Sequence, residues 1–322
     1  MDKAITVQSN RACPRCGNFD RKVLSKLKAK SFCEINSTYR KNYSDILGIK
    51  PDTEFPIAKC RDCGFIYSSW LPPAKFLRLV YDSVIDEEIG FKEYLSPDWC
   101  GHLFSILGKI LTESHRRFQY FSKPIKILDY GCGYGVFIRA LTAKGYPYKV
   151  VGLEKSERAL TFMRNTGLAV VSTEEEAEKY GPYQIIILNE VLEHIPDFRT
   201  SLNFVNMVLD VNGIVWISVP NFSDKKINRY LNLASHANPF PRELNPWEHL
   251  NYFSATSLRE ILYEEGFKPI KEKMNIDLEY QPNLQGIYKF KNALGVIKRL
   301  LISYFFRSRP RTHLLLEKRE KT

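Results

Sequence analysis

The stretch that decides the fold is Ile125-Lys126-Ile127-Leu128-Asp129-Tyr130-Gly131-Cys132-Gly133-Tyr134-Gly135-Val136-Phe137. An apolar run leads into a carboxylate, three alternate glycines follow, and an apolar-periodic segment leaves. That order predicts a strand, a tight turn and a helix, which is how an open α/β sheet builds a ligand site at the carboxyl end of a strand. The glycines carry no Cβ, so the backbone of the turn can approach a flat ligand closely.

The spacing of the glycines distinguishes two classes of ligand. A dinucleotide site has the pattern G-x-G-x-x-G, whose third glycine would fall at Val136. The chain instead places an acid, Asp129, ahead of the glycines. A carboxylate there would repel a pyrophosphate and would suit a cationic amino-acid ligand. A second acid, Glu154, ends the next apolar run, where it is placed to accept hydrogen bonds from two ribose hydroxyls.

This acidic glycine loop resembles the first motif of the class I S-adenosylmethionine-dependent methyltransferases. The segment Asn189-Glu190-Val191-Leu192-Glu193-His194 is similar to one that many of them carry after the fourth strand. The resemblance implies a doubly wound α/β fold with a mostly parallel, seven-stranded Rossmann-like sheet, and S-adenosylmethionine (SAM) as the cofactor. It assigns cofactor binding to Asp129, Gly131, Gly133, Gly135, Glu154, Asn189 and Glu190.

Two C-x-x-C-G knuckles stand near the N-terminus. They predict a tetrahedral zinc ion because each such turn points two thiolates inward. The predicted ligands are Cys13, Cys16, Cys60 and Cys63. A closed four-thiolate site leaves no position for water, so its role would be structural. The other cysteines, Cys33, Cys100 and Cys132, are interpreted as ordinary buried thiols.

The length of 322 residues predicts two domains, or one large domain with an appendage. We expect a zinc-ribbon-like module over 1–73, a helical cover or linker over 74–123, and a Rossmann-like methyltransferase domain over 124–322. The last part includes a substrate loop at 222–250 and a basic helical insertion at 287–307. A helix between the last two strands is the favoured interpretation of that insertion, and a membrane-surface helix is the alternative.

The net charge of +11 is placed at the two ends of the chain. Residues 1–63 carry 13 Lys and Arg against 7 Asp and Glu, and residues 281–322 carry 10 against 2. The remaining 64–280 carries 24 against 27 and is slightly acidic, which argues against a polynucleotide substrate. No apolar run reaches the length of a membrane span and the start is polar, so a cytoplasmic location is expected.

Two histidines follow expected strand ends, and His249 is the predicted catalytic base. It comes after the substrate loop and has Glu248 beside it to hold or tune the ring. The alternative is that His249 braces the following helix. His194 is interpreted as structural, because its segment recurs in methyltransferases with different acceptors.

The run Glu248-His249-Leu250-Asn251-Tyr252-Phe253-Ser254, joined to the knuckles, looks similar to zinc-containing sugar and natural-product methyltransferases, including nucleotide-sugar C-methyltransferases. In the C-methyltransferases a Tyr stands where this chain has Pro246, which favours an oxygen acceptor. The predicted function is therefore O-methylation of a small molecule, a sugar or related metabolite. The alternatives are a nucleotide-sugar C-methyltransferase, an RNA or protein methyltransferase, and a non-catalytic binding module. The sequence leaves the oligomeric state open.

Overall fold

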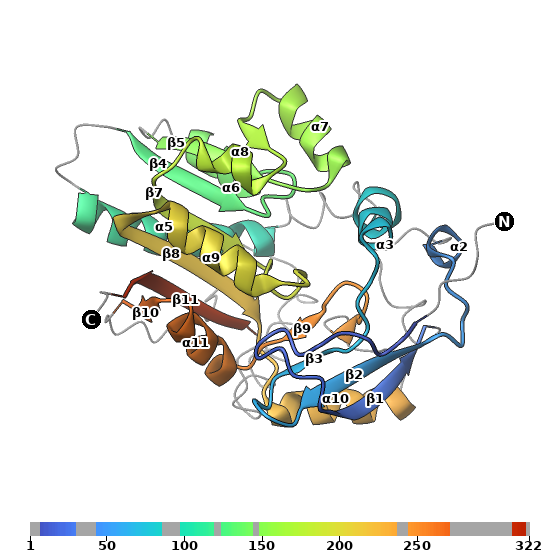
Figure 1. Ribbon diagram of the computed structural model, residues 1–322. Coiled ribbons are helices and arrows are strands. Elements are labelled where there is room, and N and C mark those ends of the chain that lie inside the picture. The colour runs from blue at the N-terminus through green and yellow to red at the C-terminus, as the bar shows by residue number, and fades with distance from the viewer. Residues whose placement is uncertain are drawn as a thin grey trace, which may run out of the picture.

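The computed structural model describes residues 7–29, 43–85, 97–118, 124–143, 148–236, 244–270 and 311–319. These residues form two sheets, one of seven strands and one of four (Figure 1). Across the described ranges, no helix combines the length and the apolar character that a bilayer crossing needs. The predicted basic insertion at 287–307 lies outside the described residues, so both interpretations of it stay predictions.

The larger sheet confirms the predicted mostly parallel, seven-stranded architecture. Only β11 runs antiparallel to its neighbours, and it lies between two strands of the common direction. Asp129 is the last residue but one of β4, and β4 is an interior strand that lies between β7 and β5. From one edge to the other the order is β10 (Phe267–Pro269), β11 (Arg311–Lys318), β8 (Leu209–Pro220), β7 (Tyr183–Asn189), β4 (Ile125–Tyr130), β5 (Tyr148–Leu153) and β6 (Val170–Val171).

Helices cover both faces of this sheet, which explains why β7 is apolar without alternation. Ile185 and Ile187 pack on one face with the core of α5 and α6, while Ile186 and Leu188 pack on the other face with α9 and α11. Each such fully buried side chain contributes about 1.5–3 kcal/mol through the hydrophobic effect. The covering helices are α5 (Pro97–Phe118), α6 (Val136–Ala143), α7 (Glu157–Asn165), α8 (Glu174–Glu178), α9 (Phe198–Val208) and α11 (Ala255–Glu264).

The smaller sheet combines the N-terminal module with a strand from far along the chain. Its order is β1 (Arg21–Lys28), β2 (Glu54–Cys60), β3 (Ile66–Ser68) and β9 (Asn251–Tyr252). In its core the ring of Phe55 makes edge contacts with Trp70 at 5.0 Å and with Trp247 at 4.9 Å between centroids. Residues of the predicted substrate segment 222–250 therefore share a core with the first part of the chain. The Asn- and Pro-rich composition predicts a loop there, but the segment contains α10 (Asp224–His236).

The smaller sheet lies beside the carboxyl ends of the parallel strands (Figure 1). Between β1 and β2, α2 (Tyr43–Leu47) packs against α3 (Ala74–Leu79) and the π-helix η1 (Val80–Val84), which follow β3 and link the two parts. Buried Arg11 joins them further: its guanidinium donates to the carbonyl oxygens of Leu250 at 2.8 Å and Pro196 at 2.6 Å, and to Oδ1 of Asn251 at 2.7 Å. A buried cation needs such acceptors to offset its lost hydration. Arg11 thus fixes the N-terminal module against the segment that follows β7.

Candidate active site and metal centre

In the glycine loop after β4, the two outer glycines pack closely against neighbouring side chains and the middle glycine stays accessible. All three glycines have φ in the left-handed region, at +69°, +50° and +72°. A Cβ at Gly131 would lie 2.7 Å from Val191, and one at Gly135 would lie 2.3 Å from the sulfur of Met163. A Cβ at Gly133 would meet nothing within 4 Å. The chain therefore leaves open space at Gly133, where a flat ligand can approach the backbone.

Asp129 is a buried carboxylate beside this loop. Its side chain is 2% exposed, and its Oδ2 accepts no hydrogen bond from the residues that the structure describes. Burial, and then the charge of Glu154, raise the pKa of Asp129 to about 7. Within the same described residues, Oδ1 of Asn189 at the end of β7 is also buried without a hydrogen-bond partner. A ligand that brings a cation and a donor to these oxygens, such as an amino acid, would fit.

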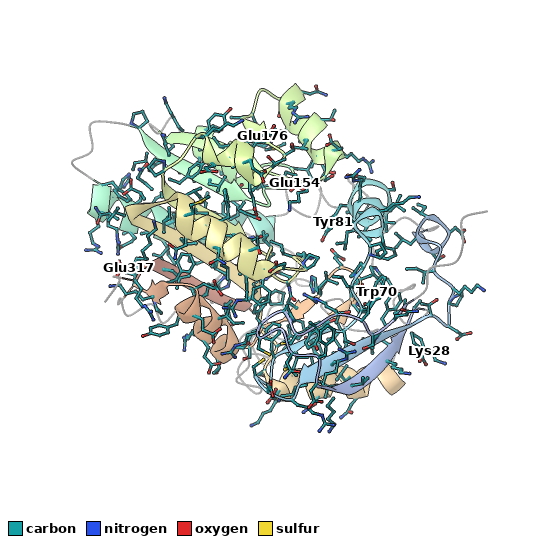
Figure 2. The ribbon with its side chains drawn as sticks, in the orientation of Figure 1. Lys28, Trp70, Tyr81, Glu154, Glu176 and Glu317 are labelled. Carbon is teal, nitrogen blue, oxygen red and sulfur yellow. The ribbon has the colours of Figure 1, made fainter. Side chains whose placement is uncertain are left out.

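Glu154 stands at the carboxyl end of β5 and is held by backbone donors. Its Oε2 accepts the N–H of Gly133 at 2.8 Å, and its Oε1 accepts the N–H groups of Lys155 and Ser156, both at 2.8 Å. Ser156 caps α7 by accepting the N–H of Ala159 at 3.3 Å. Figure 2 shows Glu154 on the side of the sheet that faces Tyr81 of η1. The acid thus fixes both the glycine loop and the start of α7.

Glu190 has an unusual backbone. Its φ of +57° makes it the one non-glycine residue with positive φ among those described, and such a conformation costs about 1–3 kcal/mol. Its carboxylate accepts from Oγ of Ser218 at 3.0 Å and from Nε of Arg311 at 3.1 Å. Burial by itself would raise the pKa of Glu190, but Arg311 and these hydrogen bonds outweigh it and lower the pKa. Glu190 is therefore ionised and its two oxygens are engaged by β8 and β11.

The structure brings the two histidines together. The rings of His194 and His249 meet edge to face with centroids 4.7 Å apart. Nδ1 of His194 donates to the carbonyl oxygen of Glu248 at 2.9 Å, while the carboxylate of Glu248 accepts from Asn245 at 3.0 Å. Burial, and then His249, lower the pKa of His194 to about 4. The sequence interpretation selected His249 and treated His194 as structural, whereas the structure places the two rings in contact with each other.

Glu193 is the residue that sequence reasoning missed. Its side chain is 1% exposed, and within the described part of the chain neither of its oxygens accepts a hydrogen bond. Its Oε1 lies 3.9 Å from Nε2 of His194. We call Glu193, His194 and His249 the histidine cluster, because one ligand atom of each lies within 4.8 Å of the others. Two Glu-His pairs in the sequence, at 193–194 and 248–249, are the signal that could have found it.

The two cysteine knuckles also meet, as their spacing predicts. Cys13 and Cys63 lie 3.5 Å apart between sulfur atoms, as do Cys16 and Cys60, and all four sulfurs lie within 4.8 Å of one another. Ligand sulfurs around a tetrahedral zinc ion lie about 3.8 Å apart, which follows from a Zn–S length of about 2.3 Å. This thiol cluster of Cys13, Cys16, Cys60 and Cys63 fits a structural zinc ion. Cys132 is buried as predicted, and the side chains of Cys33 and Cys100 lie outside the described residues.

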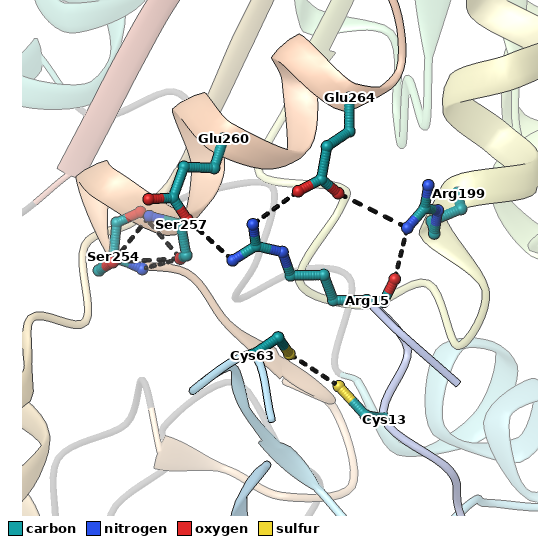
Figure 3. A network of polar contacts seen from close by, with 8 residues as sticks. All are labelled: Cys13, Arg15, Cys63, Arg199, Ser254, Ser257, Glu260 and Glu264. Carbon is teal, nitrogen blue, oxygen red and sulfur yellow. Dashed lines mark hydrogen bonds and ion pairs between the residues drawn. The ribbon is translucent and has the colours of Figure 1, made fainter. Parts of the chain in front are cut away.

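The first knuckle docks on the helices of the larger sheet (Figure 3). Arg15 donates to Glu260 at 2.8 Å and to Glu264 at 2.6 Å, both on α11. Arg199 of α9 pairs with Glu264 at 3.6 Å and also donates to the carbonyl oxygen of Arg15. A metal ion in the thiol cluster would therefore stabilise a contact between the two parts of the molecule.

Comparison with known proteins supports the assignment of the glycine-loop region to a methyltransferase domain. The family described as "Methyltransferase domain" matches residues 103–272. The chain is 26% identical to the ubiquinone biosynthesis O-methyltransferase of Erwinia tasmaniensis over 190 residues, which cover 53% of this chain and 70% of that one. It is 29% identical over 160 residues to the protein of the same name from Rickettsia prowazekii, covering 44% and 62%.

Solved structures similar to this chain include the plantazolicin methyltransferase BamL in complex with a triazolic desmethylPZN analog and SAH. The identity is 14%, the TM-score is 0.47, and the match covers 72% of this chain and 90% of that one. A SAM-dependent methyltransferase from Archaeoglobus fulgidus is 16% identical with a TM-score of 0.42, covering 72% and 100%. Because the family match spans more than half of the chain and includes the acid-flanked glycine loop, this chain belongs to the methyltransferase-domain family and is a SAM-dependent methyltransferase.

Proposed function

We propose that this enzyme transfers the methyl group of SAM to a hydroxyl oxygen of a small molecule. The observation that carries the proposal is the contact between two functional segments. The glycine loop packs directly on the segment after β7, since Val191 fills the space that a Cβ at Gly131 would take. That segment carries the histidine cluster, which therefore adjoins the proposed cofactor site.

The cofactor would be held by the residues that the methyltransferase resemblance assigns. Asp129 would pair with the ammonium group of the methionine part, because it is a buried carboxylate with an unpartnered oxygen among the described residues. Gly133 would leave room beside the backbone, and Glu154 would accept from the ribose hydroxyls. Asn189 and Glu190 would line the same end of the sheet. When bound, SAM supplies an electrophilic methyl group on a sulfonium.

The chain's own task is to orient the acceptor and to help its hydroxyl lose a proton. A hydroxyl needs such help, whereas an amine needs little. The histidine cluster offers two imidazoles and a carboxylate, and the side chain of His194 is 20% exposed, so an acceptor can reach it. His249 is the residue on which we expect turnover to depend most, and Glu248 supports the cluster through its carbonyl contact with His194.

An oxygen acceptor is also favoured by the names of the relatives, which are O-methyltransferases, and by Pro246 in place of the tyrosine of the C-methyltransferases. A sugar hydroxyl is the acceptor that the sequence resemblance favours. The near-neutral charge of 64–280 supports a small acceptor over a polynucleotide. The cytoplasmic location stays a prediction.

We further propose that the thiol cluster holds one structural zinc ion. Its four sulfur donors fill a tetrahedral shell, so they leave no coordination position for a substrate. The ion would hold the two knuckles together and, through Arg15, keep the N-terminal module on α11.

The test is to incubate the enzyme with SAM carrying a ¹³C-labelled methyl group and a panel of sugar and phenolic acceptors, with bulk RNA and bulk protein offered in parallel. NMR then shows whether the label is bound to oxygen or to carbon. We expect O-methyl products from at least one acceptor class. A label found on carbon, or found only on RNA or protein, would contradict the proposal and support the corresponding alternative.

A further inference from the structure

The histidine cluster is assembled by backbone contacts and not by chance proximity of side chains. The N–H groups of Leu250 and Asn251 donate to the carbonyl oxygen of Glu193 at 2.7 and 3.1 Å. Asn251 also donates its side-chain amide to the carbonyl oxygens of Leu192 and Ile195, each at 2.8 Å. These bonds join the segment after β7 to the segment that ends in β9. They hold together the two stretches of backbone that carry the side chains of the cluster.

The hydrogen bond of His194 fixes which ring nitrogen faces the cluster. A carbonyl oxygen only accepts, so Nδ1 of His194 must carry the proton that it donates to Glu248. In the neutral ring the lone pair is then on Nε2, which lies 3.9 Å from Oε1 of Glu193. A histidine that binds a metal characteristically donates its other N–H to a carbonyl or carboxylate in this way. The arrangement therefore presents a lone pair, and not a proton, to the carboxylate.

The carboxylate of Glu193 calls for a partner that the described residues do not supply. It is 99% buried, and neither oxygen accepts a hydrogen bond within those residues. Isolating a buried carboxylate costs several kcal/mol. The nearby cation Arg311 is already paired with Glu190 at 3.1 Å. Oε1 of Glu193 and Nε2 of His194 face each other across 3.9 Å. Burial, and then the charge of Glu190, raise the pKa of Glu193 well above its usual value, and a cation between the two groups would hold the carboxylate ionised and accept the lone pair of Nε2.

We propose that Glu193, His194 and His249 bind one divalent cation of the Mn²⁺, Fe²⁺ or Zn²⁺ class. Two imidazoles and one carboxylate form a ligand set that suits these ions and leaves coordination positions open. Neighbouring ligands around such an ion lie about 3 Å apart, so the three side chains, now within 4.8 Å of one another, need only a small movement to close on it.

The inference rests on the proposed function, because the open positions would take the acceptor hydroxyl next to the cofactor loop. A cation there would favour ionisation of that hydroxyl, and its proton would pass to solvent water. His249 would then act as a ligand in place of a free base. Activation of the acceptor hydroxyl would then depend on Glu193 as a ligand of the cation.

The test is a Mn²⁺ titration of the full chain, first loaded with a single equivalent of zinc, which the four soft thiolates take in preference to the histidine cluster, followed by electron paramagnetic resonance. Mn²⁺ prefers oxygen and nitrogen ligands, so the thiol cluster does not compete for it. We expect one Mn²⁺ per chain, bound roughly tenfold or more weakly in Glu193→Gln and in His249→Gln. The matched controls Glu157→Gln and His115→Gln, which change the same residue types on α7 and α5, should bind as the wild type does.

Affinity for S-adenosylhomocysteine, the demethylated cofactor, checks that each variant is folded. If the wild type binds no Mn²⁺, or if Glu193→Gln and His249→Gln bind it unchanged, the cation site is wrong. Methyl transfer to an oxygen acceptor at full rate in that case would leave the proposed function standing. Mn²⁺ binding by the cluster without methyl transfer to any hydroxyl would instead retain the site and reject the O-methyltransferase proposal.

Discussion

The thiol cluster and the histidine cluster are both groups of metal-ligating side chains, but they differ in the number and kind of donors. Four sulfur atoms from two knuckles meet in the first, and three nitrogen and oxygen donors meet in the second. Four thiolates complete a tetrahedral shell, whereas two imidazoles and a carboxylate leave room for another ligand. A closed donor set can therefore only hold the fold, while an open set beside the glycine loop can take part in the reaction.

Loss of one thiolate should have the largest effect, and this effect should be a loss of stability. Cys60→Ser removes a buried ligand at the end of β2, and we expect the zinc content to fall from one ion per chain to nearly none. Because structural zinc contributes folding free energy directly, the free energy of unfolding should fall by about 4 kcal/mol or more. Metal analysis and denaturant unfolding measure the two quantities. Cys132→Ser is the control and should retain zinc, and full zinc content in Cys60→Ser would refute the closed site.

Loss of an imidazole from the histidine cluster should instead lower turnover. His249→Ala is expected to lower kcat about 100- to 1000-fold, which corresponds to about 3–4 kcal/mol in the activation barrier. Its affinity for S-adenosylhomocysteine and the zinc content of its thiol cluster should stay as in the wild type. The control is His115→Ala on α5, whose ring contacts Tyr148 at 3.2 Å. A kcat for His249→Ala close to the wild-type value would remove the distinction between the clusters.

Asp129 is, like Glu193, a buried acid with an unpartnered oxygen among the described residues. Its pKa of about 7 lies above the ordinary value of about 3.9. The folded free enzyme therefore binds a proton between about pH 4 and 7 that the unfolded chain has lost, and this group's contribution to stability falls as the pH rises through that window. A bound ammonium group would stabilise the ionised form.

Cofactor affinity should consequently increase as the pH rises from about 6 to 8, with release of a proton. Asp129→Asn should remove this pH dependence and weaken binding about 10- to 30-fold at pH 8. Calorimetry in two buffers of different ionisation enthalpy measures both affinity and proton release. The same pH dependence in Asp129→Asn and in the wild type would show that another group is responsible.

The smallest effect is expected where the closed cluster docks on α11. Arg15→Ala removes two ion pairs whose acidic partners, Glu260 and Glu264, are 51% and 37% exposed. Pairs of this kind contribute up to about 1 kcal/mol, and salt screens them. The difference in unfolding free energy between Arg15→Ala and the wild type should be smaller at high salt than at low salt. Zinc should remain bound, since the four thiolates close the site themselves, and its loss in Arg15→Ala would contradict that independence.

Local patterns in the sequence were sufficient to predict the strand, turn and helix around the glycine loop, whereas the seven-stranded sheet was implied by the methyltransferase resemblance. The apolar run of β4, Asp129 near its end and the glycines after it are neighbours in the chain, so periodicity and spacing describe them. The pairing of β9 with β3 was not predictable in this way, because it joins a two-residue strand to one almost 190 positions earlier. The helix α10 was hidden by an Asn- and Pro-rich composition that favours a loop.

The candidate site likewise contains residues that local patterns predict and residues that they do not. Asp129, the glycines and the cysteines carry recognisable spacings, and the structure brings the four cysteines together as predicted. The role of Glu193 depends on its burial and on the approach of His249 from a distant segment, and neither is encoded in a local pattern. Whether a carboxylate is paired becomes visible only in the folded chain.

The turn between Asp129 and Gly135, together with Glu154, is the proposed binding site of the methyl donor. The most direct measurement is calorimetric titration of the full chain with S-adenosylhomocysteine and, separately, with NADH. We predict one binding site for S-adenosylhomocysteine, weakened in Asp129→Asn, and no binding of NADH. Binding of NADH, or no binding of S-adenosylhomocysteine by the folded wild type, would contradict the account.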